Sequence, residues 1–131
     1  MSRGGPSTEG ASQRQLRVGE AMRHELADVL TRGELRDPVL AGARVTVSEV
    51  RVARDLRSAT AFVTELGGEL RPEVRDALAR AAPYLGGRVG RSLRLKYAPR
   101  LRFEPDTAFA EAERVERLLA AARRGDGDGA A

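Results

Sequence analysis

The sequence predicts an α+β fold in which the elements follow the order α-β-β-α-α-β, with one more helix at the C-terminal end. The prediction rests on two β-branched runs separated by a short turn and on several stretches with apolar residues at helical spacing. The length of 131 residues is enough for one domain and short for two. Because only 4% of the residues are aromatic, the core must consist mainly of Val, Leu and Ala.

The first predicted helix begins after Ser12, a residue suited to cap a helix N-terminus, and ends at Gly33. Its apolar residues recur at helical spacing and are Val18, Met22, Leu26, Val29 and Leu30. Residues 1–12 and 125–131 contain little that a core could bury, so we expect them to be disordered tails. The folded domain is then predicted to span residues 13–124.

Three strands are predicted. The first covers the valine-rich run from Val45 to Val52, after the Asp37-Pro38 turn, and the second covers the alternating run from Ala59 to Thr64. The connection between them, residues 53–58, is short enough for an antiparallel hairpin. Basic and apolar residues alternate from Arg100 to Phe103, which predicts a short third strand.

Two helices are predicted between the second and third strands. Pro72 is suited to the first position of one helix, and Pro83 should end it or kink it. The buried side of that helix would consist of Val74, Ala77, Leu78 and Ala81. The next helix should run from Pro83 to Leu95 with separate apolar and basic sides. The apolar side holds Leu85, Val89 and Leu93, and the basic side holds Arg88, Arg91 and Arg94.

A final helix is predicted from Ala108 to Arg124, with Asp106 or Thr107 as its N-cap. We expect its apolar residues to face the core. These are Ala112, Val115, Leu119 and Ala122. Its acidic residues would then face outward, and they are Glu111, Glu113 and Glu116. An acidic side of this kind should not contact a polyanion.

The positive charge of the chain is concentrated in one segment. The whole chain has 23 Lys and Arg against 19 Asp and Glu, a net charge of +4. The segment from residue 80 to 102 contains seven basic residues and no acidic one, which leaves 16 basic and 19 acidic residues elsewhere. The seven are Arg80, Arg88, Arg91, Arg94, Lys96, Arg100 and Arg102. Such a run of one sign predicts a surface that binds a polyanion.

Three stretches of the sequence resemble a known family. They are QLRVGEAMRHELA from Gln15, VTVSEVRVARDLRSATAFV from Val45 to Val63, and LRLKYAPRLRFEPD from Leu93 to Asp106. With these stretches the chain resembles bacterial ribosome-binding factor A from about Arg14 to Leu119. The resemblance implies a type II KH-like fold, α-β-β-α-kink-α-β, with an additional C-terminal helix. It also implies a ribosome-assembly factor that binds the immature small (30S) ribosomal subunit and its rRNA, supports maturation of the 16S rRNA precursor, and then leaves.

The resemblance also indicates how RNA would be bound. KH domains clamp nucleotides with a Gly-x-x-Gly loop, whereas in this family a helix-kink-helix centred on an alanine takes its place, and Ala81 matches that alanine. The pair Gly87 and Gly90 lies inside a helical pattern, where glycine is typical of close packing. The family often has Arg where this chain has Gly86 and Lys96; the lysine keeps the charge but loses the guanidinium geometry.

On this interpretation the seven basic residues contact RNA phosphates and supply most of the affinity. Unpaired bases would meet the chain near the kink, between Ala81 and Tyr84. Tyr84 and Tyr97 flank the basic segment and are open to two interpretations, base stacking or amphipathic packing. The expected partners are the small ribosomal subunit and its rRNA, and we expect a monomer when the protein is free.

No catalytic, metal or cofactor site is predicted. The chain has no Cys and a single His, His24, which falls beside the apolar stripe of the first helix. Glu49 and Asp55 could form a carboxylate site at the hairpin, although Asp55 is better suited to a turn. Two alternatives stay open. One is a small homodimeric α+β enzyme that uses this carboxylate site, and the other is a protein-protein adaptor with an acidic partner.

The expected location is the cytoplasm. No run of apolar residues approaches the length of a membrane span, and the start of the chain lacks the apolar core of a signal peptide. The absence of Cys excludes a disulfide framework and a thiol nucleophile. We therefore expect no contact with a membrane and no small-molecule substrate.

Overall fold

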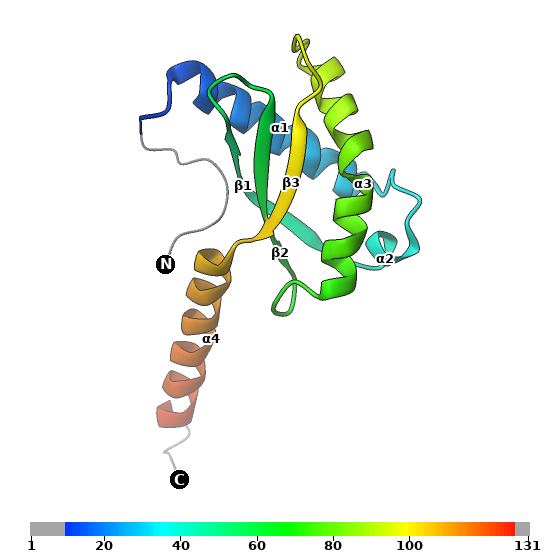
Figure 1. Cartoon of the computed structure of the whole chain (residues 1–131). Helices are drawn as coiled ribbons and strands as arrows, with labels where there is room; N and C mark the ends of the chain where they lie inside the picture. Colours follow the sequence, from blue (N-terminus) through cyan, green and yellow to red (C-terminus); the bar gives the residue numbers. More distant parts are fainter. Residues whose placement is uncertain (1–9, 128–131) are drawn as a thin grey trace.

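The computed structural model describes residues 10–127, which form a three-stranded sheet with α1 and α3 on one face (Figure 1). In chain order the elements are α1 (Gln13–Arg32), α2 (Pro38–Ala41), β1 (Val45–Val52), β2 (Ser58–Glu65), α3 (Pro72–Ser92), β3 (Arg100–Pro105) and α4 (Thr107–Gly127). The predicted α+β class and the three predicted strands are confirmed. Helix α2 was not predicted; it is a single turn that Asp37 caps by accepting a hydrogen bond from the Val39 N–H at 3.0 Å.

The sheet has the strand order β1-β2-β3, with β2 antiparallel to β1 and parallel to β3. The parallel pairing follows from α3, which crosses the sheet before β3 begins. A register irregularity between Val47 and Glu49 interrupts the alternation in β1. Because of it, Val47 and Val50 are both buried although they are three residues apart. The spacing of the valines in the sequence is therefore the signature of this bulge.

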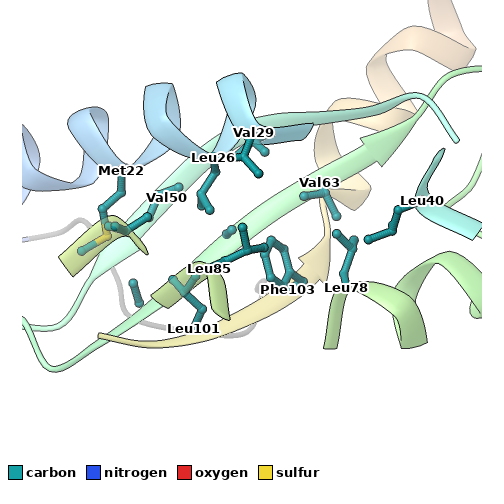
Figure 2. Close-up of a cluster of buried hydrophobic side chains, with 14 of the residues drawn as sticks. Met22, Leu26, Val29, Leu40, Val50, Val63, Leu78, Leu85, Leu101 and Phe103 are labelled. Atoms are coloured by element: carbon teal, nitrogen blue, oxygen red, sulfur yellow. The ribbon is translucent and has the colours of Figure 1, made fainter. Parts of the chain in front are cut away.

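The core lies between the sheet and the helices α1 and α3 (Figure 2). Met22 and Leu26 of α1 and Leu78 and Leu85 of α3 have no exposed surface, and Phe103 of β3 is 6% exposed. Apart from Phe103 these side chains are aliphatic, as the composition requires. Burying each of them contributes about 1.5–3 kcal/mol.

Helix α1 begins and ends where the sequence predicts. The Gln15 N–H donates to the Ser12 hydroxyl at 3.1 Å, and the Gln15 side chain accepts from the Ser12 N–H at 2.9 Å, which completes a capping box. Gly33 ends the helix in the left-handed conformation, with φ of 68°. The Gln15 amide also donates to the Val52 carbonyl at 3.0 Å. This bond holds the start of α1 against the end of β1.

The two segments predicted on either side of Pro83 belong to one helix, α3, so the predicted end of the helix at Pro83 is wrong, and the proline lies at the alternative position, inside a helix, where a kink was predicted. Pro83 has no N–H to donate, so the helix loses one backbone hydrogen bond at this point. The buried residues Leu78 and Leu85 pack into the same core on both sides of the proline, which stabilises a continuous helix. The helix also ends at Ser92, three residues earlier than predicted, so Arg94 lies beyond it.

Helix α4 extends from the end of β3 away from the sheet (Figure 1). The apolar side of α4 that was predicted to face the core is exposed, since Val115 is 44% and Leu119 48% exposed. Helical spacing identifies the apolar side of a helix but does not show that a partner covers it. The helix continues to Gly127, beyond the predicted end at Arg124. The two predicted tails otherwise fall largely outside the described residues.

Candidate nucleic-acid interface

The seven predicted RNA contacts fall into two groups in the structure. Three of them form ion pairs within the described chain. Arg80 contacts Asp37 at 2.9 Å and Arg102 contacts Glu104 at 2.8 Å, while the third, Arg88, contacts two acidic residues of the α1 region. Each of these three guanidinium groups therefore has a carboxylate partner in the same chain, and Arg102 shares Glu104 with Arg75, which contacts it at 3.0 Å.

Arg88 is the most constrained of the paired cations. Its side chain is only 25% exposed, and it contacts Glu25 at 3.3 Å and also Glu34. Hydrogen bonding to Tyr84 first, and to Glu34 and Glu25 after it, raises the pKa of the Arg88 guanidinium above its usual range. Glu25 belongs to α1 and Glu34 follows it directly, so Arg88 joins α1 to α3.

The other four predicted contacts are exposed and form no ion pair with the described residues. They are Arg91, Arg94, Lys96 and Arg100. They occupy the last turn of α3, the loop after it, and the first position of β3. Four positive charges without carboxylate partners remain available for an external polyanion.

The hairpin between β1 and β2 adds two further cations at the same end of the molecule (Figure 1). The Arg100 N–H donates to the Arg57 carbonyl at 2.8 Å, which joins the hairpin to the loop after α3. Arg54 and Arg57 are both exposed. We refer to these six residues, Arg54, Arg57, Arg91, Arg94, Lys96 and Arg100, as the basic tip. The two hairpin arginines were not predicted as RNA contacts, although the run RVARDLR from Arg51 to Arg57, around a turn, is a signal for them.

Two glycines hold the loop of the basic tip against α3. A side chain at Gly86 would collide with the carbonyl oxygen of Pro99, and a Cβ at Gly90 would lie 3.0 Å from the Cα of Ala98. The predicted pair, Gly87 and Gly90, does lie inside α3. Close packing against the loop holds for Gly90 but not for Gly87, where a Cβ would meet only the end of the Arg91 side chain at 3.3 Å. Because Gly86 faces the loop, the arginine that the resemblance suggests has no room at this position.

The helix ends in a Schellman motif that contains an arginine at the position where glycine is preferred. The Leu95 N–H donates to the Gly90 carbonyl at 2.9 Å, and the Arg94 N–H donates to the Arg91 carbonyl at 3.2 Å. Arg94 has φ of 56°, in the left-handed region, where a non-glycine residue costs about 1 kcal/mol or more.

The second strained residue is Leu56 in the hairpin, with φ of 63°. Over residues 10–127, Leu56 and Arg94 are the two non-glycine residues with positive φ. They lie in the two loops that form the basic tip. Strain of this kind concentrates at binding sites, where surrounding contacts hold it in place.

An aromatic ring lies among these cations. Tyr97 is 44% exposed, and the guanidinium carbon of Arg57 lies 4.1 Å from the centre of its ring. The Lys96 ammonium is 5.6 Å from the same ring. Asp55 accepts a hydrogen bond from the Arg57 N–H at 3.0 Å, as its predicted turn role requires.

The two carboxylates of the predicted alternative site both have partners close by in the chain. Glu49 contacts Arg51 at 2.8 Å, and His24 is exposed on α1 at 3.2 Å from Glu20. In the part of the chain that the structure describes, no three acidic, His or Cys side chains come together as metal ligands. A cavity of about 390 Å³ lies between α4 and the turn after β2, lined by Asp106, Glu111 and Arg114 among others, and not by the basic tip.

The fold and the basic tip define the class: a small α+β domain with positive charges gathered at one end of its sheet. A family model for ribosome-binding factor A matches residues 14–119, so the chain belongs to the ribosome-binding factor A family. This family consists of ribosome-binding factors, not enzymes, so the enzyme alternative is wrong. Within the described range, no helix is both long and apolar enough to cross a membrane.

Several relatives are similar over most of their length. Ribosome-binding factor A of Phenylobacterium zucineum (strain HLK1) is 50% identical over 118 residues, covering 90% of this chain and 81% of that protein. That of Xanthobacter autotrophicus (strain ATCC BAA-1158 / Py2) is 54% identical over 110 residues, covering 84% and 73%.

Two solved structures agree with the fold. The crystal structure of ribosome-binding factor A from Thermus thermophilus has a TM-score of 0.58 and 26% identity, covering 70% of this chain and 94% of that one. A homology model of the Thermus thermophilus factor, fitted into the cryo-EM map of its complex with the 30S subunit, has a TM-score of 0.53 and 26% identity. It covers 66% of this chain and 88% of that one.

Proposed function

We propose that this protein binds the small (30S) ribosomal subunit during its assembly and supports maturation of the 16S rRNA precursor. Family membership supports the proposal, as does the complex in which the Thermus thermophilus relative was placed on a 30S subunit. The observation that carries it is the basic tip, where six exposed cations from the end of α3, the following loop, the start of β3 and the β1–β2 hairpin form no ion pair with the described residues. RNA phosphates are the natural partner of such a surface.

The chemistry of this binding is noncovalent. Each phosphate that a cation of the tip neutralises releases condensed counterions, which makes binding favourable and dependent on salt. If all six cations act, the logarithm of the affinity should fall against the logarithm of salt concentration with a slope between about −4 and −5. Phosphate contacts of this kind orient the protein without reading a sequence.

The three paired cations have a different role in this proposal. Arg80 and Arg88 join α3 to α2 and α1, and Arg102 pairs within β3. These ion pairs hold the helices and β3 of the domain in position, while the basic tip contacts rRNA. A bound factor would hold the rRNA in an immature arrangement until completion of the subunit or another factor displaces it. The protein would act in the bacterial cytoplasm as a monomer.

Sedimentation of a cell lysate through sucrose gradients tests the proposal. We expect the protein, detected by antibody, to migrate with small subunits at low salt and to be lost from them at high salt. A peak at the top of the gradient under both conditions contradicts the proposal. An adaptor with an acidic protein partner would instead stay bound to its partner in the presence of excess competitor RNA.

A further inference from the structure

The Arg57–Tyr97 pair is unnecessary for phosphate binding. Arg57 could contact a phosphate through its charge and Tyr97 through its hydroxyl group, but neither contact requires a guanidinium group placed over the face of a ring. A tyrosine that serves packing buries most of its ring, yet Tyr97 is 44% exposed at the centre of the basic tip. The pair therefore requires an explanation beyond charge and beyond the core.

The pair is held in place before any ligand binds. Arg57 is fixed through both of its backbone groups: its N–H donates to Asp55 at 3.0 Å, and its carbonyl accepts from Arg100 at 2.8 Å. Tyr97 lies in the loop that Gly86 and Gly90 hold against α3. A flat, positively charged surface that is already ordered loses little conformational entropy when it binds a ligand.

We propose that the Arg57–Tyr97 pair is a stacking site for one unpaired RNA base. An aromatic ring and a guanidinium group both stack on the flat face of a base, and every base has such a face. The surrounding cations would hold the phosphates on either side of that base. The proposal rests on the proposed function and deepens it, because it names single-stranded or bulged RNA as the ligand of the tip.

A duplex cannot use this site without extruding a base. The proposal therefore separates two contributions to RNA binding. The cations of the tip act on any RNA backbone and give the salt dependence, whereas the pair acts only where a base is free to leave its stack. The preferred site would be a junction, bulge or single-stranded segment of immature rRNA.

The test compares three RNA probes by fluorescence anisotropy, using the full chain. The first probe is a single-stranded oligoadenylate of about twelve nucleotides. The second is the same strand with abasic positions, and the third is a duplex of equal length. Tyr97→Leu should weaken binding of the oligoadenylate about tenfold and leave binding of the other two probes unchanged. The salt dependence should keep its slope, because no charge is removed.

Three further variants serve as controls. Tyr97→Phe keeps the ring and should bind the oligoadenylate like the parent protein. Arg57→Lys keeps the charge but loses the planar group, so it should lose part of the preference for the oligoadenylate over the abasic strand. Tyr84→Leu removes the other exposed tyrosine, which contacts Arg88 outside the tip, and should have no effect on any probe.

Equal losses on all three probes, or no loss on any, would overturn the stacking site. If the parent protein binds subunits but does not distinguish the oligoadenylate from the abasic strand, the stacking site is wrong and the proposed function stands. If the parent protein binds none of the probes and no subunits, both proposals are wrong.

Discussion

The basic segment contains two kinds of cation that are indistinguishable in the sequence. Arg80 and Arg88 contact carboxylates that lie 43 or more residues away in the chain, and Arg102 contacts Glu104 beside it. Arg91, Arg94, Lys96 and Arg100 have no such partner among the described residues. Counting charges in the sequence therefore identifies a basic segment, whereas the fold decides which of its charges are available to RNA.

Reversing the free charges should have the largest effect. The triple variant Arg91→Glu, Arg94→Glu, Arg100→Glu should bind small subunits at least about a hundredfold more weakly, because three phosphate contacts become repulsions. Its thermal unfolding should change little, since all three side chains are exposed.

The matched control removes the same number of positive charges from α4. Arg117, Arg123 and Arg124 are exposed on that helix, away from the basic tip, and like the tip cations they form no ion pair with the described residues. Changing all three to Glu should leave subunit binding within about twofold of the parent protein. If the control loses as much affinity as the tip variant, net charge and not the tip determines binding.

Gly86→Ala should disturb the tip through packing alone. The added methyl group collides with the Pro99 carbonyl, so we expect a loss of about 1–3 kcal/mol in the free energy of unfolding. Displacement of the loop should also weaken subunit binding, although no charge has changed. Denaturant unfolding and sedimentation measure the two effects. Gly42→Ala is the control, because a Cβ there has only an ordinary contact at 3.8 Å and should cost far less.

Arg94→Gly separates stability from binding at one residue. Glycine relieves the left-handed strain at φ of 56°, so the free energy of unfolding should stay the same or rise by up to about 1 kcal/mol. Subunit binding should weaken severalfold because one cation of the tip is lost. A variant that is less stable and binds normally would show that Arg94 serves the helix end and not the ligand.

The smallest effect is expected from releasing a paired cation. Asp37→Asn preserves a side chain that can cap α2 but removes the partner of Arg80. Arg80 lies about 18 Å along α3 from the end of the helix, so its release should not increase subunit binding measurably. An affinity gain as large as the loss caused by Arg100→Gln would place Arg80 in the interface.

The same variant has a predicted pH dependence. The hydrogen bond from Arg80 holds the pKa of Asp37 below its usual range, against the opposing effect of desolvation. A lowered pKa in the folded state stabilises the protein above the ordinary Asp pKa, and this stabilisation is lost as pH falls through the lowered value. The parent protein should therefore be the more stable of the two at neutral pH, and the difference should shrink as the pH falls through the lowered pKa of Asp37.

Local signals predicted most of the fold. Ser12, Gln15 and Gly33 act within one or two turns of the chain, so α1 was predicted with correct ends. The continuity of α3 through Pro83 depends on a core that forms on both sides of the proline, which no local signal reports. The exposure of Val115 on α4 likewise depends on what lies beside the helix, not on its own spacing.

The candidate site could be predicted only in part, because local signals identify residues that are close in the sequence and not those that the fold brings together. The charge run located Arg91, Arg94, Lys96 and Arg100, because these residues are close together in the sequence. Arg57 joins them only through the hydrogen bond from Arg100 and the contact with Tyr97, which the pairing of β2 with β3 creates. The ion pairs of Arg80 and Arg88 are long-range contacts of the same kind.

The most direct test compares two arginines that lie two residues apart on β3. Arg100 is unpaired within the described chain, whereas Arg102 contacts Glu104 at 2.8 Å, and both are exposed. We would measure the affinity for small subunits over a range of salt concentrations for Arg100→Gln and Arg102→Gln. The account predicts that Arg100→Gln reduces the magnitude of the salt slope by about one and that Arg102→Gln leaves it unchanged. An equal reduction in both variants would contradict it.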